Sequence, residues 1–394
     1  MVYFIIYGIL LVCSFIELSS LTTTKGRQLL KLKDKLMVVN RINIHTVLLV
    51  FCAVILLLFA GTRYQLGIDY VSYRNIYEQT KLFSSDWDWI KTFSSLGLKN
   101  EITLYVIFAL SSSFNIAILL FSIISIIPKT IVLNHNASYP VVGLFVYFLL
   151  FFLGCDMGVI RQCAAMAFIF ASYRPLAEGN FKKFLLFIVI AFFWHRTSIV
   201  FFPAFFLSKI KLRPFAAAIA ATLCIPFAFF DMTSIMNLII RLMPDVLAGK
   251  YAVRTFEFAS YNMGISSLYR IAIFWIVSYL VWKYVTNSKS KDIREDSLVL
   301  KAYTIVFFGT CGFYLLRSIY AISGRGMYYY FIFDTVLISN LLSKIKKNEN
   351  RYIFFLLFVA LYSARFFSTL NGYVNFAPNS FNLPYLPYKS FLFT

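Results

Sequence analysis

Runs of about 20 apolar residues recur along most of this 394-residue chain. A helix of about 20 such residues crosses the roughly 30 Å hydrocarbon layer of a bilayer. In lipid, backbone amides and carbonyls must be paired inside the protein, and an α-helix pairs them within one segment. The chain is 60% hydrophobic and only 14% charged, unlike soluble domains. We therefore predict an all-α, polytopic integral membrane protein with a single membrane domain over residues 1–394.

The apolar runs predict 11 or 12 transmembrane helices. The run over residues 184–207 has basic residues at both ends. It forms either a hairpin of two short helices bent at residues 194–197 or a single crossing. No cleavage site follows the first run, which is predicted to be retained. The other expected spans are residues 3–21, 44–61, 102–127, 141–153, 159–171, 214–230, 264–282, 298–316, 326–342 and 352–367.

The net charge of +20 is unevenly distributed. Basic residues gather at Lys129 and in short segments at 25–41, 174–183, 209–213, 283–294 and 344–351. Such segments face the cytoplasm in membrane proteins. The loops at 63–100 and 231–263 and the segment 368–394 are then predicted on the outer side. This alternation argues against nucleic acid as a partner and favours membrane lipids.

The loop after the second span contains the first candidate site residues. Arg63 follows the span directly, and Asp69 and Tyr73 are spaced to share one face of a helix. An arginine close to hydrocarbon either binds an anionic group or snorkels to lipid headgroups. We predict Arg63 and Tyr73 as substrate-binding residues.

Arg161 and Gln162 begin the span after the turn that contains Asp156. Free amides at a helix N-terminus attract phosphate, and a guanidinium adds to that attraction. The alternative is an Asp156–Arg161 ion pair that stabilises the turn. We predict Arg161 and Gln162 as substrate-binding residues.

His195 lies in a polar stretch, residues 194–198, within the apolar run over residues 184–207. A lone histidine is often only a structural hydrogen-bonding residue. Its position at the predicted outer bend favours function, because histidine exchanges protons readily near neutral pH.

Arg325 has a glycine on each side and is followed by three tyrosines. We expect Arg325 at a helix start, with Tyr329 on the same helical face, an arrangement that suits a sugar phosphate. Asp334, farther along, is expected to pair with a polar group in the bundle. The chain has no P-loop, HExxH, GxSxG or metal-binding cluster, so neither metal nor cofactor is predicted.

At these residues the chain resembles the EpsG/Wzy-type polysaccharide polymerases. The resemblance rests on Gly67-x-Asp69-x-x-x-Tyr73, Arg161-Gln162, His195-x-x-Ser198, Arg325 with Tyr329, and the aromatic stretch 385–388. It extends over nearly the whole chain, and the order of the motifs is more specific than any one of them.

The resemblance implies a GT-C-like glycosyltransferase of the bacterial inner membrane whose site faces the periplasm. Donor and acceptor would be undecaprenyl-diphosphate-linked oligosaccharides, and a chain-length regulator would be a further partner. His195 is the candidate general base, and Asp69 is the alternative. An O-antigen ligase and a lipid-linked oligosaccharide flippase are the rival interpretations.

Overall fold

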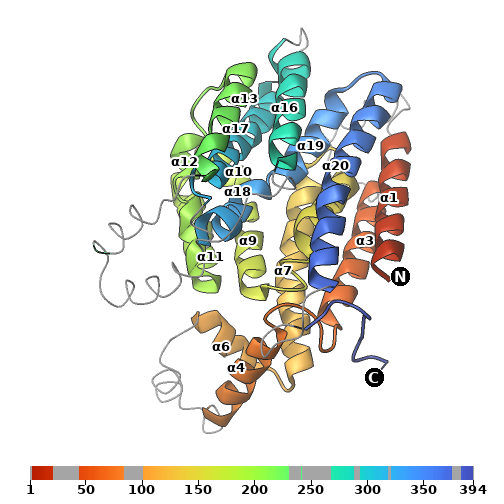
Figure 1. Cartoon of the computed structure of the whole chain (residues 1–394), viewed down its shortest axis with the longest axis vertical. Coiled ribbons are helices and arrows are strands. Elements are labelled where there is room, and N and C mark those ends of the chain that lie inside the picture. The colour runs from red at the N-terminus through yellow and green to blue at the C-terminus, as the bar shows by residue number, and fades with distance from the viewer. Residues whose placement is uncertain are drawn as a thin grey trace, which may run out of the picture. The chain divides into compact units, whose positions relative to one another are not determined.

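The computed structural model describes residues 2–20, 44–83, 101–229, 241, 268–287, 293–317, 321–374 and 383–393. Regular structure within these ranges is helical, apart from two isolated β-bridges. Five helices there contain apolar stretches long enough to cross a membrane: α1 (Val2–Ser20), α3 (Ile44–Gly61), α7 (Phe114–Asn136), α17 (Ile293–Leu315) and α20 (Asn348–Val374) (Figure 1). The prediction of an all-α polytopic membrane protein is confirmed, whereas the count of 11 or 12 crossings stays a prediction.

The chain divides into two compact units. The first contains Met1–Ala171, Val189–Arg196 and Thr335–Thr394, and the second Ser172–Ile188 and Thr197–Asp334. The chain passes between them four times: after Ala171, within α11 (Phe181–Trp194), after Arg196 and at the start of α19 (Asp334–Lys344).

The first unit contains a bundle in which α3 packs against both α1 and α7 (Figure 1). The helices of this unit include α1, α3, α4 (Tyr70–Phe83), α6 (Ile102–Leu110), α7, α8 (Pro140–Tyr147), the π-helix η1 (Phe148–Phe152), α9 (Ile160–Ala171) and α20.

The second unit is built around α17, which packs against α10, α12, α13, α16 and α18. Its elements are α10 (Tyr173–Ala177), η2 (Arg196–Phe201), α12 (Ala204–Leu207), α13 (Pro214–Leu223), η3 (Ile225–Phe229), α16 (Tyr269–Val281), η5 (Trp282–Thr286), α17 (Ile293–Leu315), η6 (Ala321–Gly326) and α18 (Tyr328–Phe331). The predicted outer loop at 231–263 and residues 84–100 of the other loop lie outside the described residues, except for residue 241.

The apolar run at 102–127 is not one tilted span, as predicted, but two helices. Residues 111–113 separate α6 from α7, and the Ser113 hydroxyl accepts a hydrogen bond from the Ile116 amide at 3.3 Å. Three consecutive serines offer the backbone local partners, which favours a helix end and a new N-cap. The restarted helix continues through Pro128 to the end of α7.

Lys129 lies within α7 and is buried, so its assignment to a basic segment between spans is wrong. Its ammonium is 2.7 Å from the Tyr147 hydroxyl, 3.0 Å from the Cys163 sulfur and 3.7 Å from Asp156 Oδ1. The Ser125 hydroxyl donates to the same Asp156 oxygen at 2.6 Å, and Tyr147 donates to the other. Buried charges are tolerated when they are paired and hydrogen-bonded, as here.

The run at 184–207 forms the predicted hairpin. Within the second unit, aromatic residues before the bend pack against aromatic residues after it. The ring centroids of Phe181 and Phe205 are 5.0 Å apart, and those of Phe184 and Phe201 are 6.1 Å apart. The beginning of α11 therefore lies beside the segment that follows the bend. A single crossing would place these rings at opposite ends, so that alternative is excluded.

Asp334 has the polar partner that the sequence predicted. The Arg270 guanidinium forms a bidentate pair with the Asp334 carboxylate and lies 3.9 Å from the centre of the Phe331 ring. Arg270 Nε also donates to the Thr310 hydroxyl at 3.2 Å. This pair ties α16 to the start of α19 within the second unit.

Replacing Lys129 by Met should destabilise the protein, because it leaves the Asp156 carboxylate as an uncompensated buried charge. Breaking a buried pair in this way costs about 3–5 kcal/mol. We expect a lower unfolding temperature of the detergent-purified protein and poorer accumulation in membranes. The control is Arg74→Met, which breaks the exposed Arg74–Glu78 pair and should cost less than about 1 kcal/mol. Equal unfolding temperatures for the two variants would contradict the stabilising role of Lys129.

Candidate functional site

One carboxylate in the first unit joins two of the predicted site residues. Glu101 Oε2 is 2.5 Å from Arg161 Nη1, and Glu101 Oε1 is 3.2 Å from His195 Nδ1. The Arg196 amide also donates to Oε1 at 3.3 Å. Arg161 and His195 follow Glu101 by 60 and 94 positions in the sequence, and both thus meet at its side chain. We call Glu101, Arg161 and His195 the acid–base cluster.

The side chains of the acid–base cluster are mostly buried but not fully so. Relative side-chain exposure is 7% for Glu101, 14% for His195 and 22% for Arg161. The histidine and arginine side chains are therefore partly exposed, whereas His195 Nε2 and the carboxylate that joins the two residues are buried. The Tyr73 ring lies next to the arginine, with its centre 5.6 Å from the guanidinium carbon.

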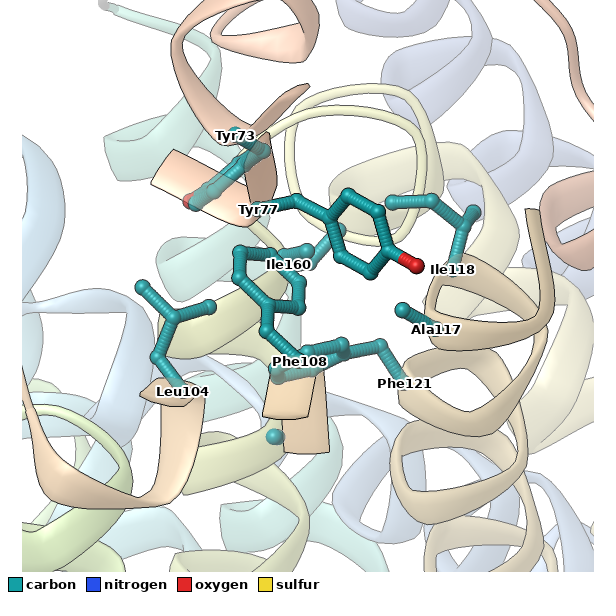
Figure 2. Close-up of a cluster of buried hydrophobic side chains, with 9 residues drawn as sticks. Tyr73, Tyr77, Leu104, Phe108, Ala117, Ile118, Phe121 and Ile160 are labelled. Atoms are coloured by element: carbon teal, nitrogen blue, oxygen red, sulfur yellow. The ribbon is translucent and has the colours of Figure 1, made fainter. Parts of the chain in front are cut away.

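A hydrophobic core beneath the cluster explains how distant segments reach one place. Figure 2 shows Tyr73 and Tyr77 of α4 converging with Leu104 and Phe108 of α6 and with side chains of α7 and α9. Its remaining buried members are Ala117, Ile118, Phe121, Ile160 and Ala164. Burial of this core orders the helix ends that carry the polar residues.

Each residue of the acid–base cluster lies beside this core in the sequence. Glu101 comes just before α6, and Ile160 of the core directly precedes Arg161. Trp194 directly precedes His195 and packs edge-on against Phe121, with ring centres 5.8 Å apart. Arg161 lies in the first turn of α9, where the sequence predicted it.

The end of α11 is fastened at the point where the bend begins. The Thr103 hydroxyl donates to the Phe193 carbonyl at 2.7 Å, which ties the first turn of α6 to the last turn of α11. The His195 amide still donates to the Ala191 carbonyl at 2.9 Å, so His195 ends the helical ladder. The imidazole therefore projects from a fixed helix end rather than from a free loop.

The Glu101 carboxylate is kept ionised by its partners. Burial alone raises its pKa, but the hydrogen bond with His195 and the charge of Arg161 outweigh burial and hold the pKa well below its ordinary value. A carboxylate on His195 Nδ1 favours the tautomer with the proton on that nitrogen, which leaves Nε2 as the basic atom.

Arg63 and Asp69 occupy the loop of residues 63–69 in the first unit. Arg63 is 1% exposed, and its Nη1 donates to the carbonyls of Ala60 at 2.9 Å and Asp156 at 2.7 Å. Asp69 directly precedes α4 with φ of 61°, and its carbonyl accepts from the Tyr73 amide. Arg63 is thus placed as a support for the turn before α9, while its predicted contact with substrate stays a prediction.

The alternative ion pair between Asp156 and Arg161 is not formed. Asp156 interacts with Lys129, and Arg161 with Glu101. Gln162 is buried, at 1% exposure, one residue beyond Arg161.

Arg325 and Tyr329 lie in the second unit. Arg325 is part of the π-helix η6 and not at the start of a helix, so that expectation is wrong. The Tyr329 side chain is fully buried, and its hydroxyl is 3.3 Å from that of Thr197. Their roles as ligands stay predictions.

Glu101 is the residue that the sequence analysis missed. Its only signal was an isolated acid immediately before an apolar run, a pattern that also describes many surface residues. Its partners are far away in sequence, so spacing could not identify it. Among the described residues no group of three or more histidine, cysteine or acidic side chains is placed to hold a metal ion.

Fold and site together define a polytopic, all-α membrane protein with a buried carboxylate that joins an arginine to a histidine. The chain belongs to the EpsG family, whose sequence profile matches residues 46–390. This is a Wzy-type polymerase-like family, so the resemblance seen in the sequence is confirmed. No curated protein and no solved structure matches the chain.

Replacing Glu101 by Gln should destabilise the first unit at the acid–base cluster, although glutamine has nearly the same shape as glutamate. The amide cannot pair with Arg161 as a charge, and we expect a loss of about 1–2 kcal/mol after allowing for partial exposure. Glu78→Gln in the exposed pair is the control. Melting temperatures of the purified variants measure both effects.

The pH dependence of that loss has a definite sign. The pKa of Glu101 is lower in the folded protein than its ordinary value. The stability that its ionised carboxylate contributes is therefore present above the ordinary pKa of glutamate, and it is lost only as pH falls through the folded-state pKa. The difference between parent and Glu101→Gln should therefore not shrink between about pH 8 and pH 5. A difference that vanishes in this interval would show that Glu101 is not held ionised.

Proposed function

We propose that this chain is a polysaccharide polymerase. It is a glycosyltransferase that moves the growing glycan from undecaprenyl diphosphate to the non-reducing end of a new lipid-linked repeat unit. Family membership supports a polymerase-like role, and the Glu101–His195 contact beside Arg161 carries the proposed reaction. The lipid diphosphate is itself the leaving group, so the reaction uses neither nucleotide sugar nor cofactor.

His195 acts as the general base in the proposed reaction. The acceptor hydroxyl oxygen bonds to the anomeric carbon of the donor glycan, and the bond from that carbon to the diphosphate oxygen breaks. The hydroxyl proton passes to His195, and Glu101 stabilises the imidazolium that results. Asp69, half-buried in the neighbouring loop, is the alternative base.

Arg161 stabilises the negative charge that develops on the departing diphosphate. A guanidinium can make two parallel hydrogen bonds to phosphate oxygens, which a lysine ammonium cannot. Tyr73 packs against the guanidinium and limits its orientations. Arg63, Gln162, Arg325 and Tyr329 remain predicted substrate ligands, and Arg63 also supports the turn before α9.

We place the protein in the bacterial inner membrane with the acid–base cluster open to the periplasm. The basic segments between spans support this orientation. The substrates are lipid-linked oligosaccharides, and a chain-length regulator is a further proposed partner. An O-antigen ligase or a flippase would act on related lipids, and the experiment below distinguishes them.

His195→Gln should reduce polymer formation by a factor of about 10²–10⁴, the usual contribution of general base catalysis. Glutamine keeps polarity and approximate size but cannot take up a proton at neutral pH. Polymer ladders are measured in a deletion strain complemented with each variant. His135→Gln is the matched control, because His135 is exposed and outside the cluster.

The same assay separates the rival functions. A polymerase defect removes the ladder but retains single-repeat product, whereas loss of both would favour a ligase or flippase. Arg161→Lys should remain strongly impaired, since a point charge does not replace a bidentate contact. Near-normal ladders from His195→Gln would move the base role to Asp69.

The proposed orientation predicts which side an impermeant thiol reagent can reach. A cysteine replacing Asn75, which is exposed on α4, should be labelled from the periplasm in intact cells. A cysteine replacing Lys347, exposed in a basic segment, should be labelled only after permeabilisation. Labelling of the Lys347 position in intact cells would overturn the orientation.

A further inference from the structure

Residues 383–393, which we call the tail segment, dock against the 63–69 loop within the first unit. The two pair as short antiparallel bridges, Arg63 with Ser390 and Gly67 with Leu383. The Tyr64 amide donates to the Lys389 carbonyl at 3.0 Å, and the Leu383 amide donates to the Gly67 carbonyl at 3.2 Å. The loop thus gains backbone partners from a segment more than 300 residues away.

A single phenol extends this contact to a third segment. Tyr385 is 1% exposed, and its hydroxyl lies 2.9 Å from the Leu153 carbonyl and 3.4 Å from the Met157 carbonyl. The Ile68 amide points to the same oxygen at 3.5 Å. Tyr385 therefore links the tail segment, the 63–69 loop and the turn of residues 153–158 that leads into α9.

A second tyrosine anchors the tail segment to α3. The Tyr388 ring stacks on Phe59 with centres 4.1 Å apart, and its hydroxyl donates to the Phe59 carbonyl at 2.8 Å. The Ser390 hydroxyl donates to that of Thr62 at 3.0 Å. The tail segment is thus held at both ends of its contact with the loop.

The loop requires such support because its backbone is strained. Gln65 and Asp69 have φ of 51° and 61°, in the left-handed region that non-glycine residues rarely adopt. Gly67 has φ of 103°, and a Cβ there would lie 2.1 Å from the Met157 carbonyl oxygen. Strained conformations persist only where the surroundings hold them in place.

We propose that the tail segment is a positioning element of the active site and that Tyr385 is its central residue. It fixes the loop that leads into α4 and Tyr73 against the turn that leads into α9 and Arg161. The side chains of Tyr73 and Arg161 meet, so their spacing depends on how loop and turn are joined. This role in catalysis rests on the proposed polymerase function.

Tyr385→Phe tests the proposal, because it removes the hydroxyl and keeps the buried ring. We expect faster amide hydrogen exchange in residues 62–69 and about ten- to hundredfold less polymer, since small misplacements of reacting groups cost that much. Membrane accumulation should stay near the parent level. Tyr352→Phe on α20, a tyrosine outside this contact, is the matched control.

A covalent link distinguishes positioning from general loss of structure. Cysteines replacing Thr62 and Ser390, whose hydroxyls are 3.0 Å apart, should form a disulfide that fastens the tail segment to the loop. In the Tyr385→Phe protein this pair should restore much of the polymer under oxidising conditions and not after reduction. The same cysteine pair in the parent protein is the reference.

Unchanged exchange in residues 62–69 of Tyr385→Phe would overturn the proposal. So would a loss of polymer that the disulfide does not restore, or faster exchange with normal polymer. The exchange measurement does not depend on the reaction. Failure of the polymerase assignment would appear instead as loss of both the ladder and the single-repeat product in the deletion strain.

Discussion

The Asp156 carboxylate is the constraint on which the first unit depends. It is buried among apolar helices, where an unpaired charge would be very costly. Ser125, Lys129, Tyr147 and Cys163 all direct polar atoms to it from three elements. This network fixes the turn of residues 153–158, whose free carbonyls then accept from Arg63 and Tyr385. The position of Arg161 at the start of α9 follows from the same turn.

Sequence periodicity and charge predicted the parts of this fold that depend on residue type alone. Spans such as 44–61 are single helices because uninterrupted apolar residues leave no other way to pair the backbone in lipid. The bend near His195 was also predictable, since a short polar stretch interrupts a long apolar run. The break at residues 111–113 was missed because a hydropathy window averages three serines with their apolar neighbours.

The remaining features depend on contacts between distant residues. Lys129 was assigned to a loop because a buried lysine and a loop lysine look the same in sequence, and only the position of Asp156 distinguishes them. Glu101 acquires its role from His195, 94 residues away. Tyr385 acquires its role from Leu153, 232 residues away. No spacing rule covers such separations, so motif order suggested the family while the structure was needed to find the residues that hold the site together.

The pairing of Arg161 with Glu101 bears directly on how the proposed reaction would proceed. An arginine that is already neutralised by a carboxylate attracts an anion less strongly than an unpaired arginine does. We therefore expect the cluster to bind the donor diphosphate weakly before the reaction. In the proposed reaction, the imidazolium formed when His195 takes the acceptor proton would compete for the Glu101 carboxylate, which contacts both His195 and Arg161. The arginine would then be released toward the diphosphate oxygen as negative charge develops there. On this proposal the shared carboxylate would strengthen the interaction in the transition state more than in the ground state, which is the requirement for an increase in rate.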